Sequence, residues 1–225
     1  MKVTLLSNCG LALEQAGAVL LIDALNKQYR CYYGLPAQTF ADMLAGAPPF
    51  DGLCGILYTH DHPDHYNAGR TEQLHAASGA PVFVPRADTP PQLSMQCGSF
   101  RVEFYRFAHI PVPGLAPVDH GVYLISAAGK SVYVTADAQI DEARHREILN
   151  GRKADAAFWN GQPLSYPQMR AFFPEAAEKN YVYHIPVDER DACGIRRKCE
   201  RNLSRYGTEL AGVCLLEQYP SEIIL

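Results

Sequence analysis

The sequence predicts a mixed α/β fold in a single domain of residues 1–225. Short segments rich in Val, Ile and Leu alternate with segments whose apolar residues recur at helical spacing. A length of 225 residues is ample for a hydrophobic core without disulfides or a structural metal. Because no stretch rich in Gly, Pro and Ser marks a boundary, one domain is the simplest arrangement.

Strands are predicted where β-branched and aromatic residues cluster in short runs bounded by turn-forming residues. Two of these runs form a hairpin around a turn at Ala128 and Gly129. The predicted strands lie at residues 3–6, 19–22, 54–58, 82–84, 100–107, 122–126, 131–135, 156–159, 181–184 and 209–216.

Helices are predicted where apolar residues recur every three to four positions. The second of them has Asn67 as its N-cap, and the last is closed by Gly207. Strands dominate the early part of each half of the chain and helices the later part, so the order of elements repeats. The predicted helices lie at residues 39–44, 67–78, 140–150, within 167–178 and at 191–206.

The composition is that of an ordinary folded protein, with 48% hydrophobic and 20% charged residues, which excludes disordered and low-complexity chains. A net charge of −4 argues against a dedicated nucleic-acid-binding protein, because such domains usually carry a basic surface. The most apolar stretch, residues 11–25, is interrupted by Glu14, Gln15 and Asp23, so no membrane span is expected.

The first residues lack the apolar core and cleavage site of a signal peptide, and we therefore expect a cytoplasmic protein. Its 7 cysteines are scattered and never form a C-x-x-C pair. This pattern argues against a disulfide framework and a thiolate zinc site, and most of the cysteines are expected to be small buried residues.

The most informative segment follows the predicted strand at 54–58 and has the sequence THDHPDH, from Thr59 to His65. Imidazole and carboxylate groups are the ligands of zinc sites that keep an open position for water, whereas closed structural sites prefer thiolates. A catalytic metal site is therefore a better interpretation than a polar surface loop.

Spacing within this segment distributes its side chains over two ions. Two histidines two residues apart in an extended segment project to the same side, so His60 and His62 can bind one ion. Asp64 and His65 follow the bend at Pro63, point elsewhere and suit a second ion.

The run ILYTHDHPDHYN, with NCGLALEQAGAVLLIDA before it and GVYLISAAGKSVYVTADAQ after it, resembles the metallo-β-lactamase superfamily of hydrolases. The resemblance covers nearly the whole chain. It implies a four-layer αββα sandwich with a site for one or two metal ions at one edge of the inner sheets. The implied ligands are the H-x-H-x-D-H string, a later histidine, an aspartate that bridges the metals and a last histidine.

In this chain the string corresponds to His60, His62, Asp64 and His65. The resemblance makes Asp137 the bridging aspartate, although Ala136 stands where the family usually has glycine, and Asp137 could alternatively cap a helix. His184, which follows a predicted strand, matches the last ligand. A strand-end histidine without a ligand role would be a core or surface residue.

The middle histidine has two candidates. His109 follows the predicted strand at 100–107, where the family usually places this ligand, and is preferred to His120, which lies immediately before the next strand. His120 is then expected at the rim of the active site, for substrate binding or proton donation. His75 and His145, on predicted helices, are expected at the surface.

The resemblance implies two Zn²⁺ ions per chain, with Mn²⁺ or Fe as alternatives. His60, His62 and His109 would bind one ion, Asp64, His65 and His184 the other, and Asp137 both. A water shared by the metals would supply the hydroxide nucleophile, which Asp64 can orient by a hydrogen bond. Asp23 and Asp61 are expected to support the ligands rather than bind metal.

The leading functional hypothesis is hydrolysis of an ester, lactone, thioester or phosphodiester in a small, anionic or carbonyl-bearing molecule, by a monomer or homodimer. A nuclease is the first alternative. The solvated face of a helix is the preferred explanation of the basic cluster that would support it. This cluster consists of Arg190, Arg196, Arg197, Lys198, Arg201 and Arg205.

The second alternative is an iron enzyme. A mononuclear-iron dioxygenase fits the ligand types, whereas the diiron oxidoreductases of the superfamily carry a glutamate in place of His62. Substrate specificity is expected to reside in loops rich in Tyr, Phe and Pro. These loops lie at residues 26–38, 86–97, 110–119 and 161–174.

Overall fold

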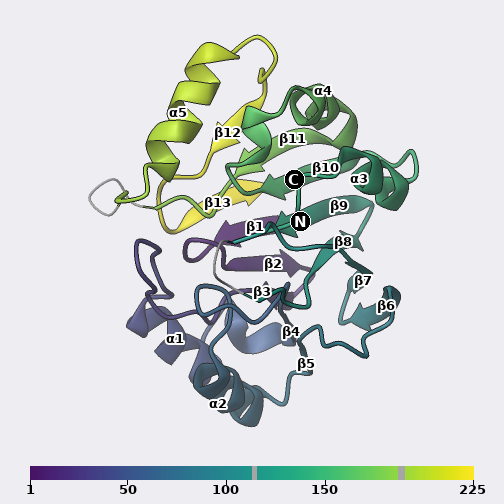
Figure 1. Cartoon of the computed structure of the whole chain (residues 1–225). Coiled ribbons are helices and arrows are strands. Elements are labelled where there is room, and N and C mark those ends of the chain that lie inside the picture. Colours follow the sequence, from purple (N-terminus) through teal and green to yellow (C-terminus); the bar gives the residue numbers. More distant parts are fainter. Residues whose placement is uncertain (113–115, 187–190) are drawn as a thin grey trace.

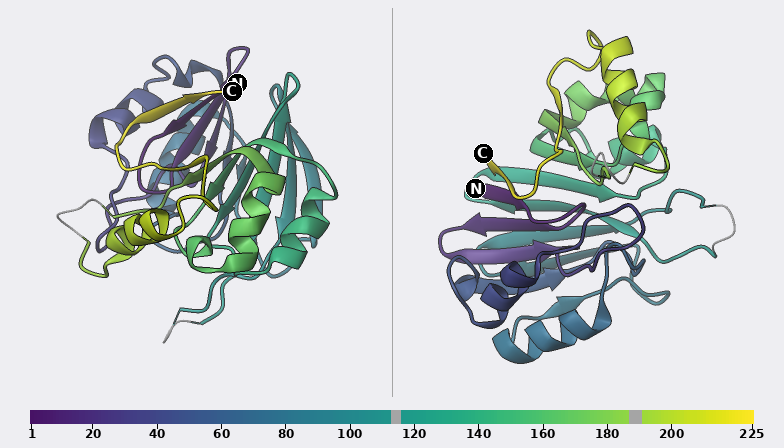
Figure 2. Two further views of the ribbon diagram at one scale, coloured as in Figure 1. Left: turned by 90° about the horizontal axis from the view of Figure 1, so that it is seen from above. Right: turned by 90° about the vertical axis from the view of Figure 1, so that its left-hand side faces the viewer.

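Two β-sheets packed face to face form the centre of the fold (Figure 1). The computed structural model describes residues 1–112, 116–186 and 191–225. Helices cover the outer face of each sheet, as the perpendicular views in Figure 2 show. The α/β class and the four-layer αββα sandwich are therefore confirmed.

The first sheet has the strand order β13-β1-β2-β3-β4-β5. The strands β1, β2 and β3 pair antiparallel with one another, whereas β3, β4 and β5 pair in parallel. The strands are β1 (Lys2–Leu5), β2 (Leu11–Gln15), β3 (Ala18–Ile22), β4 (Leu53–Leu57), β5 (Val82–Phe83) and β13 (Ser221–Ile224). The helices that accompany this sheet are α1 (Ala37–Leu44), η1 (Phe50–Gly52) and α2 (Ala68–Ser78).

The second sheet has the order β12-β11-β10-β9-β8-β7-β6 and repeats this plan, since an antiparallel part is followed by a parallel part. Its antiparallel strands are β6 (Gln92–Cys97), β7 (Phe100–Arg106), β8 (Gly121–Ala127) and β9 (Lys130–Ala136). The parallel part adds β10 (Ala154–Trp159), β11 (Ala177–Val182) and β12 (Val213–Leu215). Its helices are α3 (Glu142–Leu149), η2 (Pro163–Ser165), α4 (Pro167–Ala176) and α5 (Ile195–Arg205).

Alternation along the strands divides the apolar side chains between layers. In β3, Leu20 and Ile22 belong to the core between the sheets, whereas Val19 and Leu21 pack in the core that includes Met43 of α1. Successive residues of a strand point to opposite faces, so a strand buried on both sides must be apolar throughout. Fully burying each of these side chains stabilises the fold by about 1.5–3 kcal/mol relative to exposure.

The sequence did not predict three edge or connecting strands. Residues 92–97 were expected in a loop but form the edge strand β6, in which Gln92, Ser94 and Gln96 are exposed and only one face is covered. The strands β2 and β13 were also missed. The helix predicted up to residue 178 ends at Ala176, because Pro174 lies in its last turn and the chain becomes extended at Ala177.

Within the described ranges, no helix is long and apolar enough to cross a membrane. Arg190 of the predicted basic cluster and part of the predicted loop at 110–119 lie outside the residues that the structure describes.

Candidate metal centre

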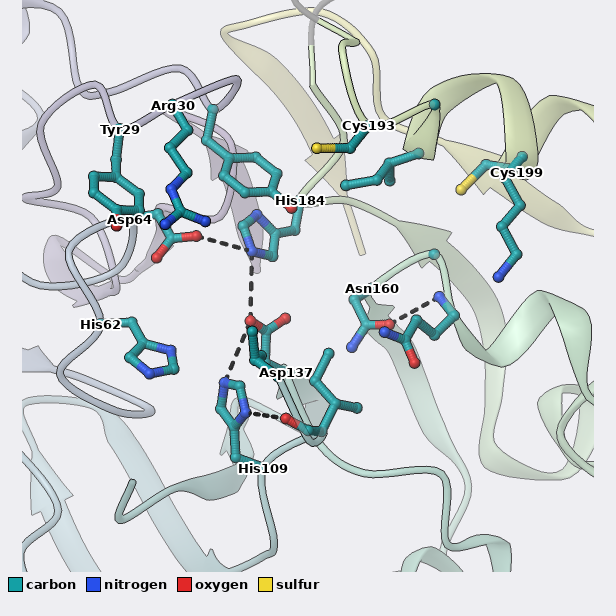
Figure 3. A pocket seen from close by; sticks show the side chains of 18 of the residues that line it. Tyr29, Arg30, His62, Asp64, His109, Asp137, Asn160, His184, Cys193 and Cys199 are labelled. Carbon is teal, nitrogen blue, oxygen red and sulfur yellow. Dashed lines mark hydrogen bonds and ion pairs between the residues drawn. The ribbon is translucent and has the colours of Figure 1, made fainter. Parts of the chain in front are cut away.

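The predicted ligands meet at the end of the sandwich where several strands finish. The segment from His60 to His65 follows β4, Asp137 follows β9, and His184 comes two residues after β11. His109 lies beyond the end of β7. Because the carboxyl ends of parallel strands share one edge of a sheet, residues far apart in sequence meet there. Figure 3 shows His62, Asp64, His109, Asp137 and His184 around one pocket.

Three imidazoles form the first group of facing ligand atoms. His60, His62 and His109 each offer a nitrogen within 4.8 Å of the others. The Nε2 atom of His60 lies 3.1 Å from Nδ1 of His62. Nε2 of His109 is buried and has no hydrogen-bond partner among the described residues.

A second group consists of His65, His184, Asp64 and Asp137. The Nε2 atoms of the two histidines are 3.3 Å apart, and Nε2 of His184 is 3.6 Å from Oδ2 of Asp64. Oδ2 of Asp137 lies 3.6 Å from Nε2 of both His65 and His184. The same oxygen is 3.5 Å from Nε2 of His109 and therefore connects the two groups.

Backbone hydrogen bonds join the segments that carry these residues. The amide of Ile110 donates to Asp137 O at 2.8 Å, in an isolated bridge between His109 and Ala138. The amide of His184 donates to Asn8 O at 2.7 Å and so ties the second sheet to the loop after β1. These bonds hold together backbone segments that are far apart in the sequence, and so they position the side chains that the segments carry.

Two residues of the site adopt the left-handed conformation that favours glycine. Ala136 has φ of 44° and His184 has φ of 58°. The value at Ala136 explains why glycine is the usual residue at this position, since a side chain there is strained. Strained backbone of this kind persists where the surrounding structure holds it, and functional sites are common locations.

Hydrogen bonds on the outer side of the rings orient the inner nitrogens. Nδ1 of His65 donates to Asp23 at 2.9 Å, and Nδ1 of His109 donates to Ile110 O at 2.6 Å. Nδ1 of His60 lies 3.0 Å from Oγ1 of Thr59, whose hydroxyl itself donates to Asp23. The remaining nitrogen of each ring is thus left to face the cluster, as in metal sites with carboxylate or carbonyl partners behind the ligands.

Burial and mutual proximity set the charges of the cluster. Burial lowers the pKa of His60 well below its usual value, and it also lowers the pKa of His62. Burial opposes ionisation of Asp137, but His184, His109 and His65 together hold the pKa of this carboxyl well below its usual range. Burial also opposes protonation of His65, but Cys9, Asp23 and Asp137 outweigh it and raise the pKa of this ring well above its usual value, so a metal ion bound there would take the place of the proton. Imidazole nitrogens beside carboxylates form a donor set suited to a cation.

The spacing of the ligand atoms fits metal coordination. A tetrahedral zinc ion with bonds of 2.0–2.1 Å keeps its ligand atoms about 3.3 Å apart. The facing atoms of the cluster are separated by 3.1–3.6 Å. These separations therefore match the spacing that a shared zinc ion requires.

No protein-family model matches the sequence, and no curated protein matches it. Solved structures do match. YhfI of Bacillus subtilis, a metallo-β-lactamase fold protein, superposes with a TM-score of 0.65 at 14% identity, over 99% of this chain and 98% of that one. The chain has the metallo-β-lactamase fold.

Two other proteins with this structural similarity have different activities. An isothiocyanate hydrolase from Delia radicum gut bacteria gives a TM-score of 0.69 at 14% identity, covering 100% of this chain and 99% of that one. The diiron β-hydroxylase CmlA of Streptomyces venezuelae gives 0.65 at 16% identity, covering 100% of this chain and 54% of that one. The metallo-β-lactamase fold therefore leaves the reaction to be argued from the residues.

The structure corrects the predicted positions of two other histidines. His120 is 1% exposed instead of lying at the rim, and its ring centre is 5.2 Å from that of His60. Burial lowers its pKa to about 3, so it carries no imidazolium proton to donate at neutral pH. His145, expected at the surface, is buried among aromatic residues, and its Nδ1 forms a hydrogen bond with the Tyr133 hydroxyl at 2.7 Å, whereas His75 is exposed as predicted.

No pattern in the sequence indicated that the loop between β1 and β2 contributes residues to the histidine–aspartate cluster. Cys9 is fully buried, and its thiol lies within 4.8 Å of ligand nitrogens of His65 and His184. This thiol donates to Asp64 O at 3.1 Å, and burial raises its pKa to about 12. The side-chain amide of Asn8 contacts Nδ1 of His184 at 2.8 Å. No spacing rule in the sequence links these residues to the histidine motif.

A pocket of about 400 Å³ opens over the cluster (Figure 3). Its floor includes His62, Asp64, Asp137 and His184. Its walls come from the loop after β3, the segment after β7 and the start of α5. Pockets of 300–1,000 Å³ are typical of small-molecule sites.

Proposed function

We propose that this chain is a metal-dependent hydrolase of small molecules, with two zinc ions per chain held by His60, His62, His109, Asp64, His65, His184 and Asp137. The observation that carries the proposal is the convergence of imidazole nitrogens and carboxylate oxygens, with facing pairs 3.1–3.6 Å apart, at the floor of an open pocket. Mn²⁺ and iron bind the same ligand types, and the measured metal content decides among them.

Zinc ions held by these residues would lower the pKa of a bound water toward roughly 7 and would polarise a carbonyl or phosphoryl oxygen. The protein residues supply position and proton control. Asp137 faces three histidines through one oxygen, and its low pKa keeps it anionic throughout the neutral range. Asp64 borders the pocket and can accept a hydrogen bond from the attacking water, which orients it toward the substrate.

Hydrolysis of an ester, lactone, thioester or phosphodiester suits this arrangement, because each reaction needs activated water and stabilisation of a developing oxyanion. A small substrate is favoured over a polymer by the size of the pocket. Two members of the basic cluster that a nuclease would use are paired within the protein, Arg196 with Glu217 and Arg197 with Asp191. An iron-dependent oxygenase remains the other alternative that metal analysis separates.

The test is to purify the protein, quantify its metals and screen a panel of aryl esters, lactones, thioesters and phosphodiesters. We expect about two zinc ions per chain and hydrolysis that is lost on chelation and restored by zinc. One iron per chain with oxygen consumption would instead indicate an oxygenase. A protein that binds no metal at micromolar concentrations would contradict the site assignment itself.

A further inference from the structure

Two cationic side chains line the pocket from different parts of the fold. Arg30 belongs to the loop after β3, and Lys198 lies in the first turn of α5. The loop follows a strand of the first sheet, whereas α5 leads from the second sheet into β12. In Figure 3, Arg30 stands on one side of the pocket and Cys199, the neighbour of Lys198, on the other.

Arg30 is held at the tip of a very tight turn. Tyr29 and Tyr32 exchange backbone hydrogen bonds of 2.9 and 3.3 Å, and Arg30 between them has φ of 50°. The turn is anchored on the site, because the ring centre of Tyr32 lies 4.2 Å from that of His184. An arginine in this conformation costs free energy, which points to a functional reason for its position.

Neither cation is paired with a carboxylate in the part of the chain that the structure describes. Arg30 contacts the ring of Tyr29 but forms no ion pair with a described carboxylate, and Lys198 forms none either. The two residues that precede Lys198 in α5, Arg196 and Arg197, are both paired. Lys198 thus differs from these two neighbours, and it is the cation of α5 that lines the pocket.

The acidic residues of the pocket do not compensate for these charges. Asp64 and Asp137 face the histidines of the cluster and would be occupied by metal. The rest of the lining includes the apolar side chains of Ile110, Val112 and Ile195. The pocket therefore combines a histidine–aspartate floor, an apolar wall and two cations that have no ion pair among the described residues.

We propose that Arg30 and Lys198 bind a carboxylate or phosphate group of the substrate while its hydrolysable bond lies at the histidine–aspartate cluster. The substrate class is thus a small amphipathic molecule with one anionic oxygen-bearing end. Guanidinium and ammonium groups both bind such anions by charge-assisted hydrogen bonds. The inference rests on the proposed metal-dependent hydrolysis and adds the part of the substrate that does not react.

The experiment is calorimetric titration of the zinc-loaded protein with 4-phenylbutyrate, phenyl phosphate and the neutral 4-phenylbutanol. We expect both anions to bind at least about tenfold more tightly than the alcohol, and the tighter of the two identifies the preferred anion. Arg30→Gln and Lys198→Gln should each weaken anion binding roughly fivefold and leave alcohol binding unchanged. The matched control is Arg201→Gln, an exposed cation of α5 outside the described lining of this pocket.

Anion affinities that stay at the wild-type value in both variants would overturn the proposal, as would equal binding of the alcohol. Zinc content is measured for every variant, so that loss of metal is not mistaken for loss of the anion site. Anion binding that depends on Arg30 and Lys198 in a protein with no zinc-dependent hydrolysis would contradict the proposed reaction and leave the anion site standing. Zinc-dependent hydrolysis by the protein, together with normal anion binding by both variants, would contradict the anion site and leave the proposed reaction standing.

Discussion

The carboxylate of Asp23 lies 2.9 Å from Nδ1 of His65 and accepts a hydrogen bond from that ring. The same carboxylate accepts hydrogen bonds from the amide and hydroxyl of Thr59, at 2.8 and 2.7 Å. Asp23 is fully buried and has φ of 50°. One side chain therefore fixes two segments behind the metal ligands.

Replacing Asp23 with Asn should weaken metal binding more than it weakens folding. Asn tolerates the left-handed backbone and keeps the size of the side chain, but it removes the charge behind His65. We expect the zinc affinity to fall by about 10–100-fold in competition with a chelator. Asp61→Asn is the control, since Asp61 pairs with Arg86 at the surface. Equal zinc affinities for the two variants would show that Asp23 has no such role.

Removal of His62 or of Asp64 should cost about one metal ion per chain in each case and abolish hydrolysis. His62 is half-buried and Asp64 is 8% exposed at the pocket, so alanine at either position should leave the fold largely intact. Metal content by mass spectrometry and far-ultraviolet circular dichroism check the two statements. His75→Ala removes an exposed histidine and should change neither. Normal turnover by both pocket variants would refute the assignment.

His109 and His120 should respond differently to substitution. Nε2 of His109 faces Asp137 at 3.5 Å, whereas His120 donates through Nδ1 to Phe107 O at 3.3 Å, and its ring centre lies 5.2 Å from that of His60. We expect His109→Ala to lose about one metal ion per chain and His120→Gln to keep both. Metal loss confined to the His120 variant would make His120 the middle ligand.

Acid should destabilise the protein partly through His145. Burial lowers the pKa of this histidine to about 3, below the usual 6.5, so the unfolded chain takes up a proton that the folded chain refuses. The stability that it contributes is complete above pH 6.5 and is lost as the pH falls from 6.5 toward 3. Between pH 6.5 and 5.5 the loss is about 1 kcal/mol.

Urea unfolding at these two pH values measures the effect. His145→Gln should lose about 1 kcal/mol less than the wild type over this interval, whereas the exposed variant His75→Gln should follow the wild type. Parallel pH profiles for wild type and His145→Gln would show that this histidine titrates normally in the folded chain.

The sequence predicted what depends on local pattern. The spacing of His60 and His62 after an apolar strand, and the strand ends before Asp137 and His184, brought the right segments to one place. The burial of a side chain by a neighbouring helix or strand could not be predicted from the local sequence. The helix of His145 shows few apolar residues, yet its histidine is packed against Phe107 and Trp159.

Polar strands escaped prediction for a related reason. The strand β6 is covered on one face only, so Gln92, Ser94 and Gln96 dilute its apolar signal. Cys9 and Asn8 reach the site through the pairing of β1 with the rest of the first sheet and through a hydrogen bond to the backbone of His184. Contacts of this kind join residues about 175 positions apart, as the bond between Asn8 and His184 does.

The cluster draws its ligands from both halves of the sandwich. His60 to His65 follow a strand of the first sheet, whereas His109, Asp137 and His184 follow strands of the second. An ion bound by ligands from both sheets would crosslink two layers that otherwise contact each other through apolar packing. The melting temperature of the protein should then rise with the free zinc concentration. The free energy of unfolding should increase by about 4 kcal/mol when free zinc is in thousandfold excess over its dissociation constant. Removal of zinc would therefore destabilise the contact between the two sheets before it destabilised either sheet on its own.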